Sequence, residues 1–359
     1  LQSILANRTK VFSIIREELT AIRDKYGDAR RTQIIADVEE LDIEDLIADE
    51  DMVITITNSG YIKRLPPSTY RQQHRGGKGV TGMTTKEDDF VKHIFIASTH
   101  DYLLVFTEEG MMFWLKVHDI PEAGRVAKGK SVVNILQLKD TQRIAAIIQT
   151  KDFDPDHFLI MATENGIVKK TSLDAFKNPR KNGIIAMGVK QGDRLIKVKM
   201  STGKNKIILG TFDGKSLCFK EENVRNMGRT ASGVTGMRMS KGDKIVGMEV
   251  LEEGATILTV CENGHGKRTD FKEYRVQGRG GKGIINIKTT ARNGKVVGFM
   301  GVSDHHDVIV STLKGMIVRM SIKDLRTIGR NTQGVRLVSL KNGDKVVSVA
   351  RIDKRSEEG

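Results

Sequence analysis

The sequence predicts an all-β protein in which short strands form the blades of a propeller-like disc, preceded by one N-terminal helix. Six copies of one pattern recur at intervals of about fifty residues, which indicates a repeat architecture. Each copy has a turn glycine after an apolar run and a second glycine 19 residues later, or 17 in the third copy. Within a copy the hydrophobic period is two, as in strands. The turn glycines are Gly60, Gly110, Gly166, Gly214, Gly264 and Gly315, and the second glycines are Gly79, Gly129, Gly183, Gly233, Gly283 and Gly334.

The first element is an amphipathic helix over residues 7–26. Its apolar residues recur at three- and four-residue steps from Val11 to Ile22, and Gly27 follows as a C-terminal stop. One helix cannot bury its own apolar stripe. We therefore assign residues 1–30 to the end of a preceding helical region, and the start at Leu1 rather than Met predicts a piece of a longer protein.

An acidic connector at residues 31–51 follows the helix. Nine carboxylates lie within residues 37–51, where no Lys or Arg occurs, although the whole chain has a formal net charge of +14. The connector is interpreted either as a solvated linker or as an electrostatic mimic of DNA. The surplus of positive charge elsewhere favours a polyanionic partner, with nucleic acid ahead of an anionic membrane.

The disc is assigned to residues 52–352. In the fourth copy the predicted strands are residues 206–209, 215–219, 234–237 and 244–248, so four successive strands make one blade. Tight Asn-Gly, Asp-Gly and Glu-Gly turns join the first two strands. Residues 52–57 form an apolar strand with no preceding copy, and we predict that it pairs near the final blade and helps to close the ring. Residues 353–359 are expected to be a disordered tail.

Two glycine-rich basic loops, called boxes here, carry the strongest functional signal. Their glycines allow positive φ angles and close approach of the backbone to a phosphate, while Arg and Lys supply charge and N–H donors. The alternative is a tight connection between strands with solvated charges. The first box is Gln73, His74, Arg75, Gly76, Gly77, Lys78 and Gly79, and the second is Gln277, Gly278, Arg279, Gly280, Gly281, Lys282 and Gly283.

Weaker basic segments occupy the same place in the other copies, and basic pairs follow three of the turn glycines. For any one residue of these segments a solvated turn and a DNA contact are both open. Together with Arg279 and Lys282 of the second box, the additional DNA-binding candidates are Arg71, Lys63, Arg64, Arg125, Lys128, Lys130, Arg180, Lys181, Arg225, Arg229, Lys267, Arg268, Arg326 and Arg330, with the pair Lys169 and Lys170 on the same hairpin face.

Other motifs are interpreted as incidental. Residues 124–131 match the P-loop pattern GxxxxGK[ST], but a strand is predicted at 132–136 where a P-loop requires a helix. Residues 304–307, Asp-His-His-Asp, are adjacent on an expected exposed turn, so no metal site is predicted. Cys218 and Cys261 form neither a zinc motif nor a disulfide framework, which fits a reducing compartment. No catalytic constellation is found.

Residues 73–79 resemble the box Gln-Arg-Arg-Gly-Gly-Lys-Gly of the C-terminal domain of the A subunit of bacterial DNA gyrase. All six copies and the Arg-Glu-Glu-Leu segment at 16–19 are also similar to that family. One departure is His74, which stands where the family has Arg and lowers the charge at neutral pH. The resemblance implies a six-bladed β-pinwheel that wraps double-stranded DNA around its rim in a positive sense, so that the holoenzyme introduces negative supercoils.

The resemblance also implies the context of the domain. The parent would be an ATP-dependent type II topoisomerase whose catalytic tyrosine precedes Leu1, so this fragment would be non-catalytic. It would use no cofactor itself, while the parent uses ATP and Mg through other regions. The implied partners are the rest of the gyrase A subunit and the gyrase B subunit in an A2B2 heterotetramer. A monomeric fragment in the bacterial cytoplasm, associated with the nucleoid and not with a membrane, is expected.

Two alternatives remain. The corresponding domain of topoisomerase IV is similar but usually has fewer blades and a degenerate first box. A propeller that serves as a protein-interaction platform is the alternative from another class, although the blade signatures of WD40 and kelch proteins are missing. Wrapping of DNA would separate the first interpretation from both.

Overall fold

The computed structural model describes residues 2–28, 32, 46–57, 59–66, 91–124, 127–136, 138–139, 142–251, 254–314, 316–340 and 343–353. The chain separates into two compact units, Leu1–Leu46 and Ile47–Gly359. Most of the acidic connector and residues 354–359 of the expected tail lie outside the described residues. The two units are therefore considered one at a time.

The first unit contains helices α1 (Gln2–Leu5) and α2 (Arg8–Tyr26). Asn7 begins α2, since its side chain accepts a hydrogen bond from the main-chain N–H of Thr9 at 3.1 Å. After the last turn, the main-chain N–H of Gly27 donates to the carbonyl of Arg23. The expected helix and its stop at Gly27 are confirmed, and the short α1 is an addition to the single helix expected.

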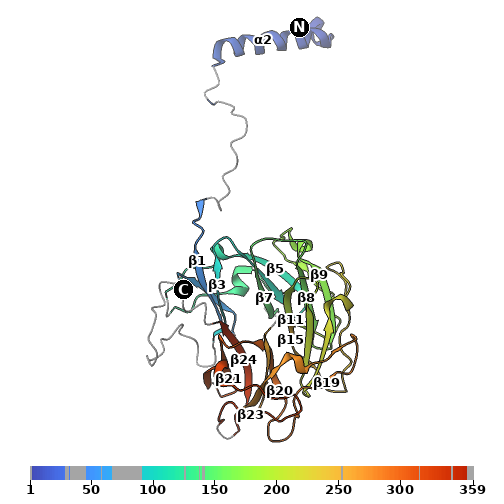
Figure 1. Ribbon diagram of the computed structural model, residues 1–359. Coiled ribbons are helices and arrows are strands. Elements are labelled where there is room, and N and C mark those ends of the chain that lie inside the picture. The colour runs from blue at the N-terminus through green and yellow to red at the C-terminus, as the bar shows by residue number, and fades with distance from the viewer. Residues whose placement is uncertain are drawn as a thin grey trace. The chain divides into compact units, whose positions relative to one another are not determined.

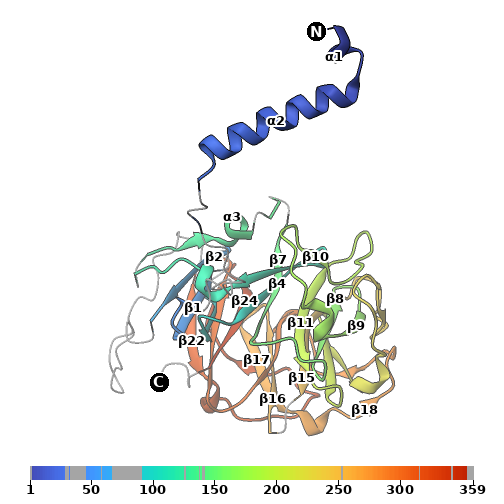
Figure 2. The same ribbon diagram turned by 90° about the horizontal axis from the view of Figure 1, so that it is seen from above.

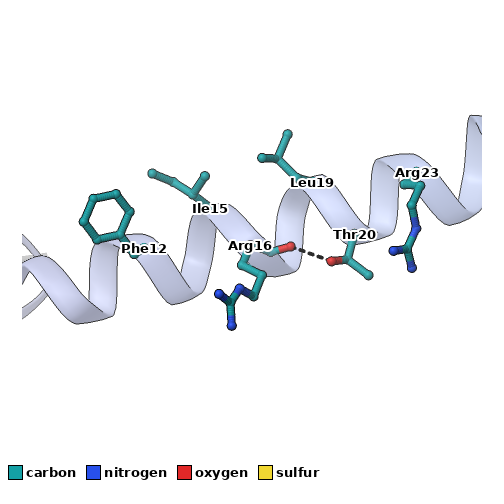
Figure 3. A pocket seen from close by; sticks show the side chains of 6 residues that line it. All are labelled: Phe12, Ile15, Arg16, Leu19, Thr20 and Arg23. Atoms are coloured by element: carbon teal, nitrogen blue, oxygen red, sulfur yellow. Dashed lines mark hydrogen bonds between the residues drawn. The ribbon is translucent and has the colours of Figure 1, made fainter.

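Helix α2 is amphipathic, and none of its residues is buried. Figure 3 shows the apolar side chains projecting on one side of the helix and the polar side chains on the other. The apolar side chains are Phe12, Ile15 and Leu19, and the polar ones are Arg16, Thr20 and Arg23. None of the described helices is both long and apolar enough to span a membrane.

The second unit is a six-bladed β-propeller, and the expected fold class is confirmed (Figure 1). Blade one contains β1 (Asp51–Thr57), β2 (Tyr61–Leu65), β3 (Val91–Ser98) and β6 (Lys130–Ser131). Blade two contains β4 (Tyr102–Thr107), β5 (Met111–Lys116), β7 (Ile144–Thr150) and β10 (Ile184–Ile185). Blade three contains β8 (Phe158–Thr163), β9 (Ile167–Ser172), β11 (Leu195–Ser201) and β14 (Val234–Thr235).

The remaining three blades follow the same plan. Blade four contains β12 (Lys206–Thr211), β13 (Lys215–Lys220), β15 (Ile245–Leu251), β18 (Val276–Gln277) and β19 (Ile284–Ile285). Blade five contains β16 (Thr256–Cys261), β17 (His265–Asp270), β20 (Val296–Val302) and β23 (Val335–Arg336). Blade six, within the described residues, contains β21 (His306–Thr312), β22 (Ile317–Ser321) and β24 (Val346–Asp353).

Short helical segments follow the second long strand of the hairpins in blades two to six, and one more follows β6. The helix α3 (Val132–Leu136) belongs to the second copy. The 3-10 helices are η3 (Val117–Asp119), η4 (Leu173–Phe176), η5 (Glu221–Asn223), η6 (Phe271–Glu273) and η7 (Ile322–Asp324).

The second to sixth copies each contribute a short strand to the blade of the preceding copy. The strand β14, from the fourth copy, pairs with β9 of blade three through Val234 and Val168. Likewise β19, from the fifth copy, pairs with β13 of blade four. The prediction that four successive strands of one copy make one blade is therefore wrong. The loop between η5 and β14 carries the chain across to the neighbouring sheet, where the edge of β9 is available for pairing.

Glycine makes the hairpin turns within the blades possible. Gly110, Gly166, Gly214 and Gly264 have φ angles of 82, 82, 85 and 76°. Such left-handed conformations favour residues without a Cβ. The tight turns expected from the sequence are confirmed at these positions, while Gly315 lies outside the described residues.

The hydrophobic core lies between the blades, because each sheet has neighbours on both faces. Ile54 of β1 and Leu103 of β4 share one cluster, and Leu104 of β4 shares the next cluster with Leu159 of β8. All six residues of β16 are buried. Each large apolar side chain buried in this way contributes about 1.5 to 3 kcal/mol of transfer free energy.

The innermost strands of successive blades contact one another from β7 through β11, β15, β20 and β24 to β3 (Figures 1 and 2). The strand β24 of blade six contacts β3 of blade one, so the first and last blades are adjacent. The strand β1 hydrogen-bonds to β2 and β3 and lies inside blade one. The prediction that residues 52–57 pair near the final blade is wrong, because β3 and not β1 forms that side of the blade.

Two further local predictions are corrected. The segment Val132–Leu136 is the helix α3 and not a strand, even though its apolar residues form a run. The helix has 5 residues, and the strand β6 occupies Lys130 and Ser131, where a P-loop would already have begun its helix. In the Asp-His-His-Asp segment, His306 and Asp307 belong to β21 and are buried, because the strand begins earlier than the predicted turn allows.

Candidate nucleic-acid interface

The basic loops of the second unit lie at the outer edge of the propeller. In the sheets of blades one to five the innermost long strand is at one end, and the short strand that follows a loop is at the other. A second glycine with positive φ stands immediately before the short strands, as at Gly233 (91°), Gly283 (72°) and Gly334 (77°). A Cβ on Gly283 would lie 2.5 Å from the carbonyl oxygen of Ser216 on the receiving strand. These glycines therefore let each loop dock closely against the preceding blade.

The structure places the predicted loop cations in two groups. One group is half-buried: Lys128, Arg229, Arg279 and Arg330. The other group is exposed: Lys130, Arg180, Lys181, Arg225, Lys282 and Arg326. Within the described residues, no ion pair involves Arg180, Lys181, Arg225, Lys282 or Arg326. We call these five residues the rim cations.

The half-buried arginines connect successive loops. Arg279 donates from Nε to the carbonyl of Asn223 at 3.1 Å and from Nη1 to that of Thr235 at 2.5 Å. Arg330 donates from Nη1 to the carbonyl of Ile285 at 2.7 Å. Both guanidinium groups therefore hold the short strand of the preceding copy, which is a structural task in addition to any contact with a partner.

Main-chain hydrogen bonds strengthen this connection. The N–H of Arg238 donates to the carbonyl of Gly281 at 2.9 Å, and the N–H of Lys288 donates to the carbonyl of Thr332 at 2.9 Å. In the same way the N–H of Gly188 donates to Ala231 at 3.1 Å. The third, fourth, fifth and sixth loops are thus joined in sequence along the rim, and their spacing is fixed.

Three predicted contacts on the hairpins are buried instead of exposed. The side chains of Lys63, Lys169 and Lys267 are 0, 0 and 1% exposed. Burial lowers the pKa of Lys63, that of Lys169 to about 8 and that of Lys267 to about 7. Each Nζ donates to main-chain carbonyls, which satisfies the buried amine. The placement of these lysines on the exposed face is therefore corrected, because charge alone does not reveal that a lysine has carbonyl acceptors inside the fold.

The neighbouring hairpin cations are also engaged within the propeller. Arg64 donates from Nε to the carbonyl of Ile120 at 2.7 Å. Arg268 donates to Thr256 Oγ1 at 2.7 Å and forms an ion pair with Asp304 at 2.6 Å. Lys170, buried like Lys169, faces Glu221 at 3.9 Å. The hairpin pairs therefore stabilise the blades and do not extend the rim cations.

Several predicted residues lie outside the described residues, so the structure does not test them. They are Arg71, all of the first box (Gln73, His74, Arg75, Gly76, Gly77, Lys78 and Gly79) and Arg125.

Cations near the inner strands are paired between blades. Arg194, one residue before β11, contacts Glu164 at 2.9 Å and Glu108 of the preceding blade at 3.4 Å. Lys244, one residue before β15, contacts Glu164 of the preceding blade at 3.1 Å. The hydrogen bond from Arg194 holds the pKa of Glu164 below its usual range. The cations next to the inner strands are therefore neutralised by glutamates, whereas the rim cations have no ion-pair partner among the described residues.

Three exposed cations near the loops were missed from the sequence, the first being Arg275, which stands at the same place in its copy as Arg225 and Arg326 do in theirs. Arg238 and Lys288 are exposed, and each follows the second glycine of its copy by five residues. Arg238 lies beside the second box, since its N–H donates to Gly281. The sequence signal that could have identified Arg238 and Lys288 is their constant distance from the second glycine of the repeat. Among the described residues no group of His, Cys, Asp and Glu could hold a metal ion.

Comparison with protein families gives six consecutive matches along the second unit. The matching family model is described as the DNA gyrase C-terminal domain, β-propeller, and it matches residues 51–98, 101–151, 157–201, 205–252, 255–303 and 306–353. The A subunit of DNA gyrase from Haloquadratum walsbyi is 43% identical over 99% of this chain and 43% of its own length. The A subunit of DNA gyrase from Staphylococcus aureus is 42% identical over 100% of this chain and 41% of its own length. The chain thus spans about two fifths of these relatives.

Two solved structures have a similar fold. The C-terminal domain of DNA topoisomerase IV has a TM-score of 0.74 and 26% identity, covering 87% of this chain and 97% of that domain. The C-terminal domain of DNA gyrase A has a TM-score of 0.68 and 26% identity, covering 84% of this chain and 100% of that domain.

Proposed function

The chain belongs to the family of DNA gyrase C-terminal β-propeller domains, and from this premise we propose that its rim binds and wraps duplex DNA. Wrapping in a positive sense would let the holoenzyme introduce negative supercoils by strand passage. The domain itself is proposed to be non-catalytic.

The observation that carries this proposal is the recurrence of unpaired charge on consecutive loops. The rim cations occur in the third, fourth, fifth and sixth copies, always between the second long strand and the second glycine. Each Lys or Arg placed on a phosphate releases condensed counterions and so favours binding. Contacts of this kind position a duplex without reading its bases. A sequence-independent duplex surface fits this arrangement.

Repetition of the loops supports wrapping rather than binding of straight DNA. Smooth bending of a duplex by tens of degrees over two or three turns costs about 1 to 6 kcal/mol. A single loop does not offset that cost, whereas consecutive loops that are hydrogen-bonded to one another act together. The inter-loop bonds of Arg279 and Arg330 keep the bound path in register.

Residues of the first box are retained as proposed contacts on the strength of the family resemblance. Replacing Arg75 and Lys78 with Ala is expected to reduce wrapping more than simple binding, because the remaining loops still hold the duplex. Equal loss of both would contradict this division between the loops. Arg71, Gln73 and His74 are proposed to lie in the same contact.

The wider context is proposed from the curated relatives, of which this chain spans about two fifths. We assign strand cleavage and the use of ATP and Mg to other regions of the parent topoisomerase. The proposed partners are the remainder of the gyrase A subunit and the gyrase B subunit in an A2B2 assembly. Association with the nucleoid in the bacterial cytoplasm follows from a DNA substrate.

The decisive experiment measures the topology of relaxed circular DNA closed by ligase in the presence of the protein. Positive writhe is the expected result, and an unchanged linking number despite binding would refute wrapping. The salt dependence of affinity provides a matched comparison between Lys282→Ala and Lys244→Ala. Loss of the unpaired Lys282 should make the negative slope of log K against log salt shallower by about 0.9. Replacement of Lys244, which is paired with Glu164, should leave the slope nearly unchanged.

Topoisomerase IV suggests a second candidate, because its C-terminal domain overlays this chain with a TM-score of 0.74. On that interpretation the rim would bind duplex DNA as part of a topoisomerase IV subunit.

A further inference from the structure

The buried lysines at the third position after the turn glycine form a set with a common geometry. They occur in the first, third and fifth copies as Lys63, Lys169 and Lys267. Lys267 Nζ donates to the carbonyls of Gly329 and Arg330 at 2.9 and 2.7 Å. Each lysine thus reaches from its own blade into the loop of the following copy.

The other two lysines make the equivalent contacts. Lys169 Nζ donates to the carbonyl of Arg229 and to that of Ala186 at 2.6 Å. Lys63 Nζ donates to the carbonyls of Gly124 and Ala127 at 3.2 and 3.0 Å. The second, fourth and sixth loops are therefore each held from inside by one buried amine.

The even-numbered copies have an apolar residue at the same position, namely Phe113, Leu217 and Val318. A Cβ on Gly183 would lie 2.7 Å from the ring of Phe113, and one on Gly281 would lie 3.4 Å from Leu217. The third and fifth loops thus rest on apolar side chains. From the second loop to the sixth, the residue behind the loop alternates between an amine and an apolar group.

The amine contacts determine the direction of peptide groups in the loop. In a planar trans peptide, the N–H of a residue points opposite to the carbonyl of the residue before it. Because Gly329 and Arg330 direct their carbonyls to Lys267, the N–H groups of Arg330 and Asn331 point away from that lysine. By the same geometry Lys169 turns the N–H of Thr230 outward.

These N–H groups are available to a ligand. Thr230 and Asn331 are exposed, and the N–H groups of Thr230, Arg330 and Asn331 have no hydrogen-bond acceptor in the described part of the chain. In the sixth loop the adjacent outward-pointing N–H groups of Arg330 and Asn331 form an anion-binding concavity, while the fourth loop offers the single N–H of Thr230. A phosphate oxygen is the acceptor that such a concavity suits.

We propose that the fourth and sixth loops each bind a phosphodiester group of duplex DNA through main-chain N–H groups that the buried Lys169 and Lys267 orient. The sites are the N–H of Thr230 in the fourth loop and those of Arg330 and Asn331 in the sixth. The lysines are positioning residues and do not touch DNA. This inference rests on the proposed function, because it names the atoms by which the same rim holds the DNA backbone.

The test follows the amide resonances of Thr230, Arg330 and Asn331 in the full chain as duplex DNA of about two helical turns is added. We expect downfield shifts of their amide protons. In Lys267→Met the shifts at Arg330 and Asn331 should disappear, while that at Thr230 persists as an internal control. Affinity is expected to fall by about tenfold, which is the effect of losing a hydrogen bond to a charged group.

A matched variant separates orientation from charge. Lys282→Met removes one exposed cation and should weaken binding while it leaves the three amide shifts in place. If Lys267→Met does not fold, Lys169→Met gives the reciprocal test, with loss at Thr230 and retention at Asn331. Binding of DNA by the native protein without these shifts overturns the inference but not the proposed function. Absence of any DNA binding overturns the proposed function itself.

Discussion

Replacement of Gly283 by alanine tests whether docking of a loop on the preceding blade depends on this glycine. Gly283 has a φ of 72°, and a Cβ there would lie 2.5 Å from the main-chain oxygen of Ser216. Ser216 pairs with Ile284 in the ladder between β13 and β19. The new methyl group therefore collides with backbone that cannot move without breaking this pairing.

The magnitude of the effect follows from two contributions. A non-glycine residue in the left-handed region costs about 1 to 2 kcal/mol. Loss of the hydrogen bonds between β13 and β19 adds about 1 kcal/mol for each bond. Together they lower the free energy of unfolding by about 3 kcal/mol. Gly278 in the same loop is the matched control, since it has no heavy atom within 4 Å of a built Cβ.

The assay is urea unfolding of both variants followed by far-ultraviolet circular dichroism, together with the ligation assay of DNA topology. Gly283→Ala should be less stable and should wrap less DNA, because detachment of β19 displaces Lys282. Gly278→Ala should match the native protein. A loss smaller than about 0.5 kcal/mol in Gly283→Ala, or equal losses in both variants, would refute the argument from close approach.

Three further predictions concern buried and paired groups. The difference in the free energy of unfolding between the native protein and Lys267→Met should rise by about 2 kcal/mol between about pH 7 and 9. The pKa of Lys267 is about 7 in the folded chain and 10.5 in the unfolded chain, so the unfolded chain binds more protons in this range and stability increases with pH. A flat difference would contradict the lowered pKa. Burial raises the pKa of Cys218 to about 11 and of Cys261 to about 12, so iodoacetamide should label both only after unfolding, as judged by mass spectrometry; rapid labelling of the folded protein would contradict this. Arg194→Met should lower the free energy of unfolding by less than about 1 kcal/mol and leave DNA affinity unchanged, because its pair with Glu164 is partly exposed; a larger loss would show that the pair controls the contact between blades.

The repeat and its turns could be predicted from sequence because local chemistry specifies them. A turn such as Asn165-Gly166 needs positive φ whatever surrounds it, and the period of two marks the strands on either side. The partner of a two-residue strand is different. Nothing local to Val234 and Thr235 specifies pairing with β9 of the preceding blade, because that choice depends on which sheet edge is available after folding.

Only part of the candidate site could be predicted, because some of its features depend on local sequence and others on contacts between distant segments. Exposed cations such as Lys181 and Lys282 follow from the position of the loops in the repeat. Lys63 and Lys267 are also lysines, but they are buried. The carbonyls that accept hydrogen bonds from their Nζ atoms belong to a loop about sixty residues away. A single sequence does not show contacts over such distances. The burial of these amines became apparent only when strand and loop were placed together.

The alternation of amine and apolar residues behind the loops makes a pair of copies the smallest unit by which such a ring can grow or shrink. Removal of the fourth copy alone would place Lys169 behind the glycine-rich fifth loop, whose contact in this protein is the apolar Leu217. Duplication or deletion of a whole pair, about one hundred residues, keeps every loop on a matching neighbour. The propeller is in this sense built of three pairs of copies.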